Sequence, residues 1–304
     1  MYLQYYLEKL GYLNIPDFLI KYLETPSLLR LKKVGYFCGM DYASKDIYDF
    51  SEYISRYDHS LTVGLIVYKL TKNKKATLAG LFHDIATPCF SHVIDYMNED
   101  YEKQESTEEF TEEILKNDKY LRKCLEEDHI DINDVINFKK YTIVDNDRPK
   151  VCADRIDGVI LTGIACLKNL SKDDISKIID NMCVYINENN EEEIGFKSLS
   201  IAFKVLEVSK SIDVYFHSQE DNYMMQLLSK ITKLAIDKKY ILYSDLYSYN
   251  EEQIFNIFNE INDDELKVLI SKFKNIKKEE IPNVKFPEIK RRKLNPIACG
   301  KRIK

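Results

Sequence analysis

Three of the five histidines lie within residues 56–95, and their spacing constrains the fold more than any other feature of the chain. His59 precedes a strongly apolar run at helical spacing, residues 61–81, which leads into the adjacent pair His83 and Asp84. A buried pair of helices is needed to bring these side chains to one point. Imidazole nitrogen together with carboxylate oxygen is a ligand set suited to a divalent metal ion. The stretch therefore predicts a helical scaffold built around a metal site.

The composition favours long helices over a turn-rich β architecture, because nine glycines and seven prolines are few for 304 residues. Apolar residues at 45% and charged residues at 31% are typical of a globular protein with a sizeable core. No apolar run approaches the roughly 20 residues that a membrane span needs, so no membrane association is expected. We expect no signal peptide either, because Glu8 and Lys9 interrupt the first apolar residues.

The seven cysteines are scattered and never form a C-x-x-C pair. This usage predicts reduced thiols in a cytoplasmic protein and disfavours a thiolate zinc site. The formal net charge of −6 argues against a general nucleic-acid coat. A small anionic ligand stays compatible with this charge, because a bound metal ion dominates the local field.

The periodicity of the apolar residues predicts an all-α fold. Helical spacing is clear over residues 53–70 and 76–83, and Val151 to Leu167 is expected to form a further long helix. Residues 198–236 are also strongly helical in pattern. Weak alternation from Met182 to Phe196, interrupted by a polar turn, is consistent with one small β-hairpin.

We find no internal repeat, low-complexity tract or clear linker, and therefore expect one unit over residues 1–304. Its core is expected at about 50–170, with a helical C-terminal part at about 171–304. The tail carries a basic run, Lys290 to Lys293. This run could reach a phosphate or an interface, although charge runs are most often solvated.

An ordered series of short motifs extends the first pattern along most of the chain. In order, these are Thr25-Pro26-x-x-x-Arg30-Leu31, Arg56-Tyr57-Asp58-His59, His83-Asp84, Phe90-Ser91-His92 with Asp95, Asp154-Arg155-Ile156-Asp157, and Lys293-Leu294-Asn295-Pro296. The series resembles that of the HD-domain metal-dependent phosphohydrolases, and most closely that of the dNTP triphosphohydrolase-like members.

This resemblance implies an HD-domain helical bundle with peripheral helices and a divalent metal ion (Mn, Fe, Ni, Mg or Zn). The ligands that it implies are His59, His83, Asp84 and Asp154. It also implies hydrolysis of a phosphate ester or anhydride in a nucleotide or related small molecule, by water that the metal activates. By analogy alone, a homo-oligomer is expected.

Three further residues match family positions beside the scissile phosphate. We expect His92 to act as the acid that protonates the leaving oxygen, with Asp95 orienting it and Arg56 binding a phosphate. Structural alternatives stay open for each. His92 and Asp95 could be satisfied structural residues, and Arg56 could pair with Asp58 or Glu52.

The chain departs from the resemblance at several positions around the substrate. Thr87 stands where the triphosphohydrolases carry a catalytic histidine, and Lys103 stands where a second one is found. Gly158 replaces a tyrosine that holds the sugar, Thr162 replaces an acidic residue, and Tyr36 replaces a glutamine. These departures predict that the metal ligands are intact, whereas the residues that surround the substrate (the substrate wall) differ from those of the family.

Three classes of function remain open at this stage. The first is a phosphohydrolase, which requires bound metal. The second is a regulatory or sensor module, in which the set of metal ligands persists as structure or as a nucleotide sensor and turnover is lost with the histidines replaced at Thr87 and Lys103. Buried structural roles also stay open for His59, His83 and Asp84, as does pairing of Asp154 with Arg155. The third is a nucleic-acid-binding protein that uses the basic tail, which would give an affinity steeply dependent on salt.

Overall fold

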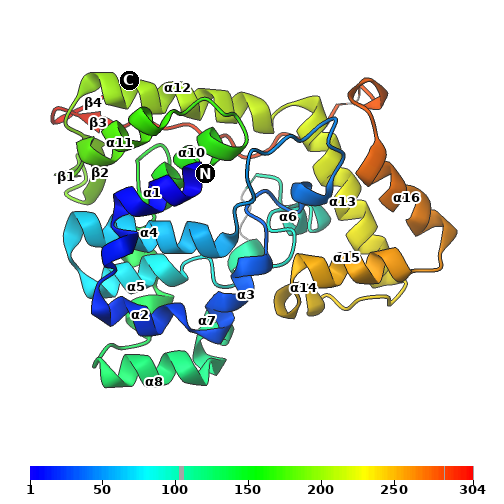
Figure 1. Cartoon of the computed structure of the whole chain (residues 1–304), viewed down its shortest axis with the longest axis horizontal. Helices are drawn as coiled ribbons and strands as arrows, with labels where there is room; N and C mark the ends of the chain where they lie inside the picture. The colour runs from blue at the N-terminus through cyan, green and yellow to red at the C-terminus, as the bar shows by residue number, and fades with distance from the viewer. Residues whose placement is uncertain (103–105, 284, 304) are drawn as a thin grey trace.

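The computed structural model describes residues 1–102, 106–283 and 285–303, and within them the chain is mostly helical with one small sheet (Figure 1). The helices of the first half are α1 (Tyr2–Leu10), α2 (Asp17–Leu23), α3 (Pro26–Arg30), α4 (Arg56–Thr71), α5 (Lys74–Phe82), α6 (Val93–Met97), α7 (Thr111–Asn117), α8 (Lys119–Glu127) and α9 (Asn133–Ile136). Those of the second half are α10 (Ala153–Ala165), α11 (Lys172–Asn181), α12 (Leu199–Phe216), α13 (Gln219–Asp237), α14 (Asp245–Ser248), α15 (Glu251–Glu260) and α16 (Asp264–Asn275). The predicted all-α fold class is confirmed.

Helices α4 and α5 pack closely against each other in the left half of the view in Figure 1. Helix α4 begins at Arg56 because Ser55 and Asp58 form a reciprocal capping box across its first turn. Glycine favours the close approach at Gly80, where a Cβ would lie 3.3 Å from Val63 and require a small shift, whereas a Cβ on Gly64 would make an ordinary contact with Leu81 at 3.4 Å. This packing brings the start of α4 beside the end of α5, where the predicted metal ligands lie.

Helix α10 packs against α4 and supplies the third side of this centre. Two backbone hydrogen bonds fix its start, from the Ala153 and Asp154 N–H groups to the carbonyls of Ile143 and Val144. The first turn of α10 therefore has a defined position before any side chain in it is considered.

The predicted hairpin is confirmed as β1 (Met182–Ile186) paired antiparallel with β2 (Glu192–Phe196). The sheet is larger than expected, because β3 (Ile297–Ala298) pairs parallel with β2 and β4 (Lys301–Arg302) closes the order β1-β2-β3-β4. Gly195 permits this addition, since a Cβ there would lie 2.5 Å from the Ile297 carbonyl oxygen. Strands of two residues carry no periodicity, so the sequence could not indicate them.

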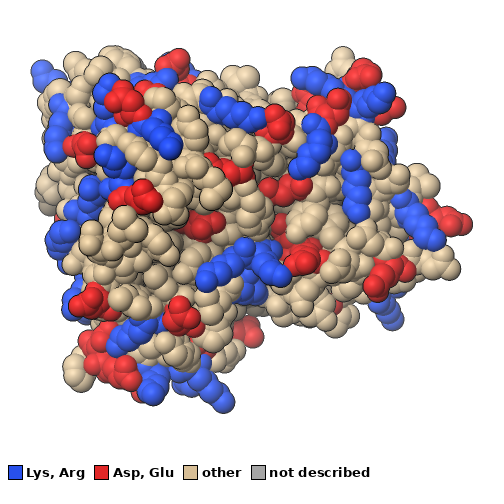
Figure 2. All heavy atoms as spheres, in the orientation of Figure 1, with Lys and Arg blue, Asp and Glu red and all other residues tan. Residues whose placement is uncertain are grey.

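The C-terminal segment runs back from α16 across the molecule to reach this sheet (Figure 1). Residues 198–236 form two helices, α12 and α13, because Ser218 caps α13 by accepting a hydrogen bond from the Asp221 N–H. No helix in the described ranges is long and apolar enough to cross a membrane. On the face shown in Figure 2, Lys and Arg side chains are interspersed with Asp and Glu.

Candidate metal centre and adjoining pocket

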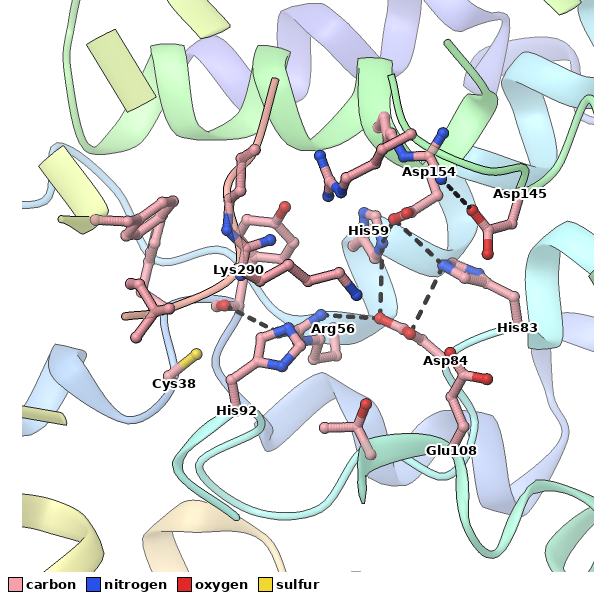
Figure 3. Close-up of a pocket in the computed structure, with 18 of the residues that line it drawn as sticks. Cys38, Arg56, His59, His83, Asp84, His92, Glu108, Asp145, Asp154 and Lys290 are labelled. Atoms are coloured by element: carbon pink, nitrogen blue, oxygen red, sulfur yellow. Dashed lines mark hydrogen bonds and ion pairs between the residues drawn. The ribbon is translucent and has the colours of Figure 1, made fainter. Parts of the chain in front are cut away.

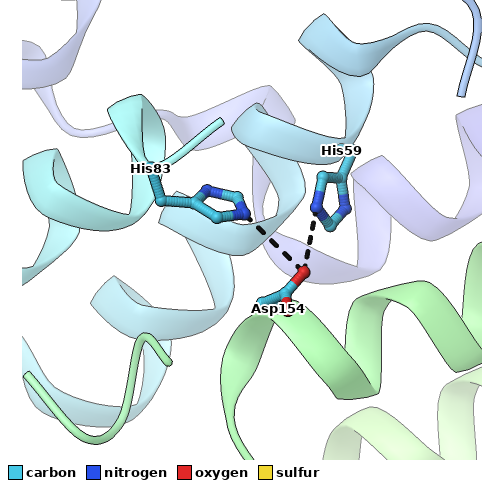
Figure 4. A group of neighbouring side chains, drawn as sticks. All are labelled: His59, His83 and Asp154. Atoms are coloured by element: carbon cyan, nitrogen blue, oxygen red, sulfur yellow. Dashed lines mark ion pairs between the residues drawn. The ribbon is translucent and has the colours of Figure 1, made fainter. Parts of the chain in front are cut away.

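Three predicted ligands point toward one another from three helices (Figure 4). His59 lies in the first turn of α4, His83 directly follows α5, and Asp154 lies in the first turn of α10. The Asp154 Oδ1 atom is 3.2 Å from His59 Nε2 and 3.7 Å from His83 Nε2. One ligand atom from each residue lies within 4.8 Å of the others, so the group can hold a metal ion.

The fourth predicted ligand, Asp84, lies beside this group (Figure 3). Its two carboxylate oxygens are 3.6 Å from His59 Nε2 and 3.7 Å from His83 Nε2. Arg56 donates from Nη1 to Asp84 Oδ2 at 2.8 Å. Asp84 is therefore held in place by an arginine that is itself buried.

The alternative partners of Arg56 are engaged elsewhere. Asp58 accepts hydrogen bonds from Ser55 at the start of α4, and Glu52 accepts from two N–H groups at the start of α1. The Arg56 Nε also donates to Ser91 Oγ at 3.1 Å, and its guanidinium lies 4.9 Å from the centre of the Tyr36 ring.

The outer nitrogen of each histidine ring is occupied. His59 Nδ1 lies 2.7 Å from Asp157 Oδ2, whose other oxygen accepts the Tyr6 hydroxyl at 2.6 Å, and His83 Nδ1 lies 2.8 Å from the Gly80 carbonyl. These acceptors assign the proton to Nδ1 and direct the lone pair of Nε2 inward, as in histidines that bind metals. His83 Nε2 is buried and has no hydrogen-bond partner among the described residues. An inward lone pair without a partner fits a metal ligand.

The electrostatics of the group also favour a cation. Burial opposes the charged form of His59, but hydrogen bonds with Asp154 and Asp157 raise its pKa to about 10. Burial also opposes ionisation of Asp84, but His83 and Arg56 lower its pKa to about 2. Carboxylates therefore surround both imidazoles, and a divalent cation would supply the positive charge that this arrangement attracts.

His92 and Asp95 form a hydrogen-bonded pair on the pocket wall. His92 Nδ1 lies 2.8 Å from Asp95 Oδ2, and Asp95 is fully buried, with Oδ1 accepting from the Ser106 N–H. Phe90 and Ser91, just before His92, both have left-handed backbone conformations with φ of 66° and 45°. Such residues cost about 1–2 kcal/mol each, so contacts from elsewhere must hold this turn.

The positions that depart from the family resemblance have different structural outcomes. Thr87 is buried outside the pocket lining, and Arg30 Nη2 donates to its carbonyl at 2.7 Å. Lys103 lies outside the described residues. Tyr36 and Gly158 are coupled, because a Cβ on Gly158 would lie 2.9 Å from the Tyr36 hydroxyl. The Tyr36 ring thus takes the space next to position 158.

A cavity of about 540 Å³ adjoins the metal centre, and the residues that line it include both predicted and unexpected ones. Besides Arg56, its Lys and Arg side chains are Lys139, Arg148, Lys150, Arg155, Lys290 and Arg292. Lys290 projects into the pocket from the C-terminal segment (Figure 3). The basic run of the tail, which charge statistics alone would place in solvent, therefore contributes to this wall.

The arginines of this wall differ in their surroundings. Arg155 donates to Asp145 at 3.0 Å, which excludes the predicted alternative in which it pairs with Asp154. Burial, followed by the charges of Arg292 and Arg155, lowers the pKa of Arg148 to about 10. Cations that lower one another's pKa in this way repel each other, and a bound anion would relieve this repulsion.

Comparison with known proteins agrees with the geometry of the metal centre. Residues 56–159 match the HD domain. HD domains characterise a superfamily of metal-dependent phosphohydrolases, and His59, His83 and Asp154 lie within the matched range. The chain is also 23% identical over 219 residues to a protein of Bacillus subtilis (strain 168) named "Uncharacterized protein YdhJ". That match covers 72% of the chain and 65% of the relative, just under two thirds of the relative's length.

Sequence reasoning missed several residues of this site. The sequence analysis names Asp157 only as the last residue of the motif that begins at Asp154, and its contact with His59 is not predicted there. Asp221 and Tyr48 also line the pocket, although the sequence around Asp221 indicates only a helix cap. A long-range signal for these residues is absent from a single sequence.

Proposed function

We propose that the protein is a metal-dependent phosphohydrolase that cleaves a phosphate ester or anhydride of a nucleotide or related phosphate compound. The observation that carries this proposal is the convergence of His59 Nε2, His83 Nε2 and Asp154 Oδ1, with each Nδ1 held by an outer acceptor. The match of residues 56–159 to the HD domain supports it.

The donor set fits a divalent ion, which His59, His83, Asp84 and Asp154 would hold. Two nitrogen and two oxygen donors suit Mn, Fe, Ni or Zn, and the carboxylates also suit Mg. Such an ion supplies Lewis-acid polarisation of a phosphoryl group and makes water nucleophilic near neutral pH. Arg56 keeps the Asp84 carboxylate in place and is first of all a positioning residue. Its direct contact with a phosphate is part of the proposal.

His92 is the group proposed to protonate the leaving oxygen. Its Nδ1 is held by Asp95, so Nε2 is the atom available to the pocket. Burial lowers the pKa of His92, and Asp95 opposes this effect. A phosphate dianion bound beside the ring would favour the protonated form, because an opposite charge stabilises the imidazolium. Asp95 would then hold the ring orientation during the transfer.

The rest of the pocket suits the remainder of such a substrate. Its volume of about 540 Å³ is within the range of roughly 300–1,000 Å³ that is typical of small-molecule sites. Arg148, Lys290 and Arg292 add positive charge on one wall, where the phosphates not bound by the metal would lie.

The proposal is tested by metal analysis of the purified protein together with a panel of nucleotides and Mn, Fe, Ni, Co or Mg added back. We expect bound metal and phosphate release from at least one nucleotide class. The matched control is His129→Ala, since His129 is exposed and does not line the pocket. Absence of metal at neutral pH after reconstitution would contradict the proposal.

A regulatory module that binds a nucleotide without turnover is the second candidate. It is favoured by one observation, that Thr87 lies buried outside the pocket lining where the resemblance implies a catalytic histidine. This candidate predicts stabilisation by a nucleotide without product formation. Phosphate release that is abolished by His83→Ala would exclude it.

A further inference from the structure

The motif Ser-x-x-Asp begins three helices, and in one of the three the aspartate side chain does not cap its helix. The three are Ser55 to Asp58 on α4, Ser171 to Asp174 on α11, and Ser218 to Asp221 on α13. On α4 and α11 the carboxylate accepts from the serine N–H and completes a capping box. On α13 only the serine hydroxyl caps, and Asp221 instead accepts the Tyr48 hydroxyl at 2.9 Å. The Asp221 carboxyl is therefore diverted from its helix into the pocket.

The diverted carboxyl is in an unusual environment. Asp221 is only 7% exposed and lines the pocket, yet it forms no ion pair within the described part of the chain. Burial raises its pKa to about 7, while Tyr48 and Arg292 act in the opposite direction. A buried carboxyl facing a cavity is costly unless a hydrogen-bond donor satisfies it.

A wall of aromatic rings connects this carboxyl to the metal centre. Tyr36 lies 5.1 Å from the His59 ring and 5.3 Å from Phe37, and Phe37 stacks on Phe50 at 4.3 Å. Phe50 in turn lies 5.5 Å from Tyr48, the partner of Asp221. Each of these residues lines the same cavity. Metal ligands and a lone carboxyl thus mark the two ends of one aromatic surface.

We propose that Asp221 recognises the base of the substrate and selects guanine. This inference rests on the proposed function, because it takes the ligand to be a nucleotide. A carboxylate has two acceptor oxygens, and guanine has two adjacent donors, N1–H and the 2-amino group. Adenine presents an acceptor at N1 and cytosine one at N3, while uracil and thymine have a single N–H between two carbonyls. The aromatic wall supplies a stacking surface for a flat ring.

The ends of the site match the ends of a nucleotide. The phosphates require the metal and the basic side chains, and Arg56 with Asp84 marks that end. The base must then lie away from the metal, where the wall ends at Tyr48 and Asp221. Selectivity follows because a base that lacks the second donor would leave one oxygen of the buried Asp221 carboxylate unsatisfied.

The test uses nucleosides, which carry no phosphate, with the full-length protein and isothermal titration calorimetry. We expect guanosine to bind more tightly than inosine, which lacks the 2-amino group, and inosine more tightly than adenosine. Asp221→Asn should weaken guanosine binding by about tenfold or more and leave adenosine binding unchanged, because an amide cannot accept both donors. Guanosine affinity should rise with pH through about 7, as Asp221 ionises.

The matched control is Asp174→Asn, the same substitution at the same helix position outside the pocket. Its nucleoside affinities should equal those of the unmodified protein. Replacement of a buried carboxyl by an amide should not unfold the chain, and circular dichroism of both variants verifies this.

Three results would overturn the inference. The first is equal affinity for guanosine and adenosine, and the second is an equal loss of affinity for both nucleosides in Asp221→Asn. The third is that Asp221→Asn removes only a preference for guanosine over deoxyguanosine, which would assign Asp221 to the ribose. Phosphate release without base preference would sink this inference and leave the proposed function intact. Guanosine binding without phosphate release from any nucleotide would contradict the proposed function and leave this inference intact.

Discussion

The metal centre and the substrate wall are built from the chain in different ways. The metal centre takes its ligands from helix ends within residues 56–159. His59 and Asp84 are held by side chains from adjoining helices, and His83 by a carbonyl of its own helix. The substrate wall combines Tyr36, Arg148, Asp221 and Arg292, which lie in four separate parts of the chain. The proposed chemistry thus depends on short motifs, whereas the proposed selectivity depends on how distant segments of the chain assemble.

The two regions also differ in how substitutions are accommodated. The residues that the resemblance implies as ligands all lie together at the metal centre, and removal of any one would leave buried charged groups without a partner. In the substrate wall, two positions that depart from the resemblance lie side by side, since Tyr36 fills the space beside Gly158. A wall that changes in this way can accept a different substrate without changing the reaction.

The largest effect should come from removing a metal ligand. His83→Ala removes an inward nitrogen that no other described residue satisfies, so we expect both bound metal and phosphate release to fall to background. Metal content by mass spectrometry and a phosphate assay measure this. Retention of full metal content in the variant would place the ion elsewhere and break the comparison.

A smaller loss should follow from changing the residue behind His59. Asp157→Asn weakens the acceptor that holds His59 Nδ1 and should reduce metal affinity or activity by about 10–100-fold. Tyr6→Phe removes only the outer hydrogen bond to Asp157 and should have a lesser effect. Equal effects of the two variants would indicate general destabilisation instead of ligand orientation, which thermal unfolding would reveal.

The substrate wall should respond mainly in KM. Arg292→Ala removes a cation from the pocket and should raise KM for a nucleotide about tenfold, with a smaller change in kcat. The adjacent Arg291 is the matched control, because its side chain is half exposed and pairs with Asp213. If Arg291→Ala raised KM equally, the tail would act through its overall charge and the wall assignment would be wrong.

The smallest effect on activity is expected at Glu251, which is buried and does not line the pocket. Glu251, at the start of α15, accepts from the Phe90 N–H at 3.2 Å and contacts the backbone of Gly35. Burial, followed by repulsion from Asp41, raises the pKa of Glu251 from 4.5 to about 8. Its proton is therefore retained in the folded state at pH values where the unfolded chain releases it.

The sign of the pH effect follows from this raised pKa. The contribution of Glu251 to the free energy of unfolding is full below about pH 4.5 and is lost as pH rises through about 8. At about 1.4 kcal/mol per pKa unit, the loss is on the order of a few kcal/mol, part of it shared with Asp41. In urea unfolding between pH 5 and 9, Glu251→Gln should make the free energy of unfolding less dependent on pH, by on the order of a few kcal/mol over this range. Parallel curves for both proteins would refute the assignment.

The sequence alone was sufficient for the fold class, the β1–β2 hairpin and the ligands that gather at the metal centre. Helical periodicity is a local feature that acts through the nearest turns of the backbone, whereas Asp154 entered the ligand set only through the resemblance of the ordered motifs to a known family. The likeness to the HD domain could be drawn from the same ordered motifs.

Only the tertiary structure decided which residue pairs with Arg56 and which residues form the substrate wall. The sequence offered Asp58 and Glu52 as partners of Arg56, but the packing of α4 against α5 places Asp84 closer. The contact of Tyr48 with Asp221 joins residues 173 positions apart, and the basic tail reaches the pocket because β3 pairs with β2. Such contacts depend on the assembled chain, since no local pattern encodes which distant side chains share one cavity.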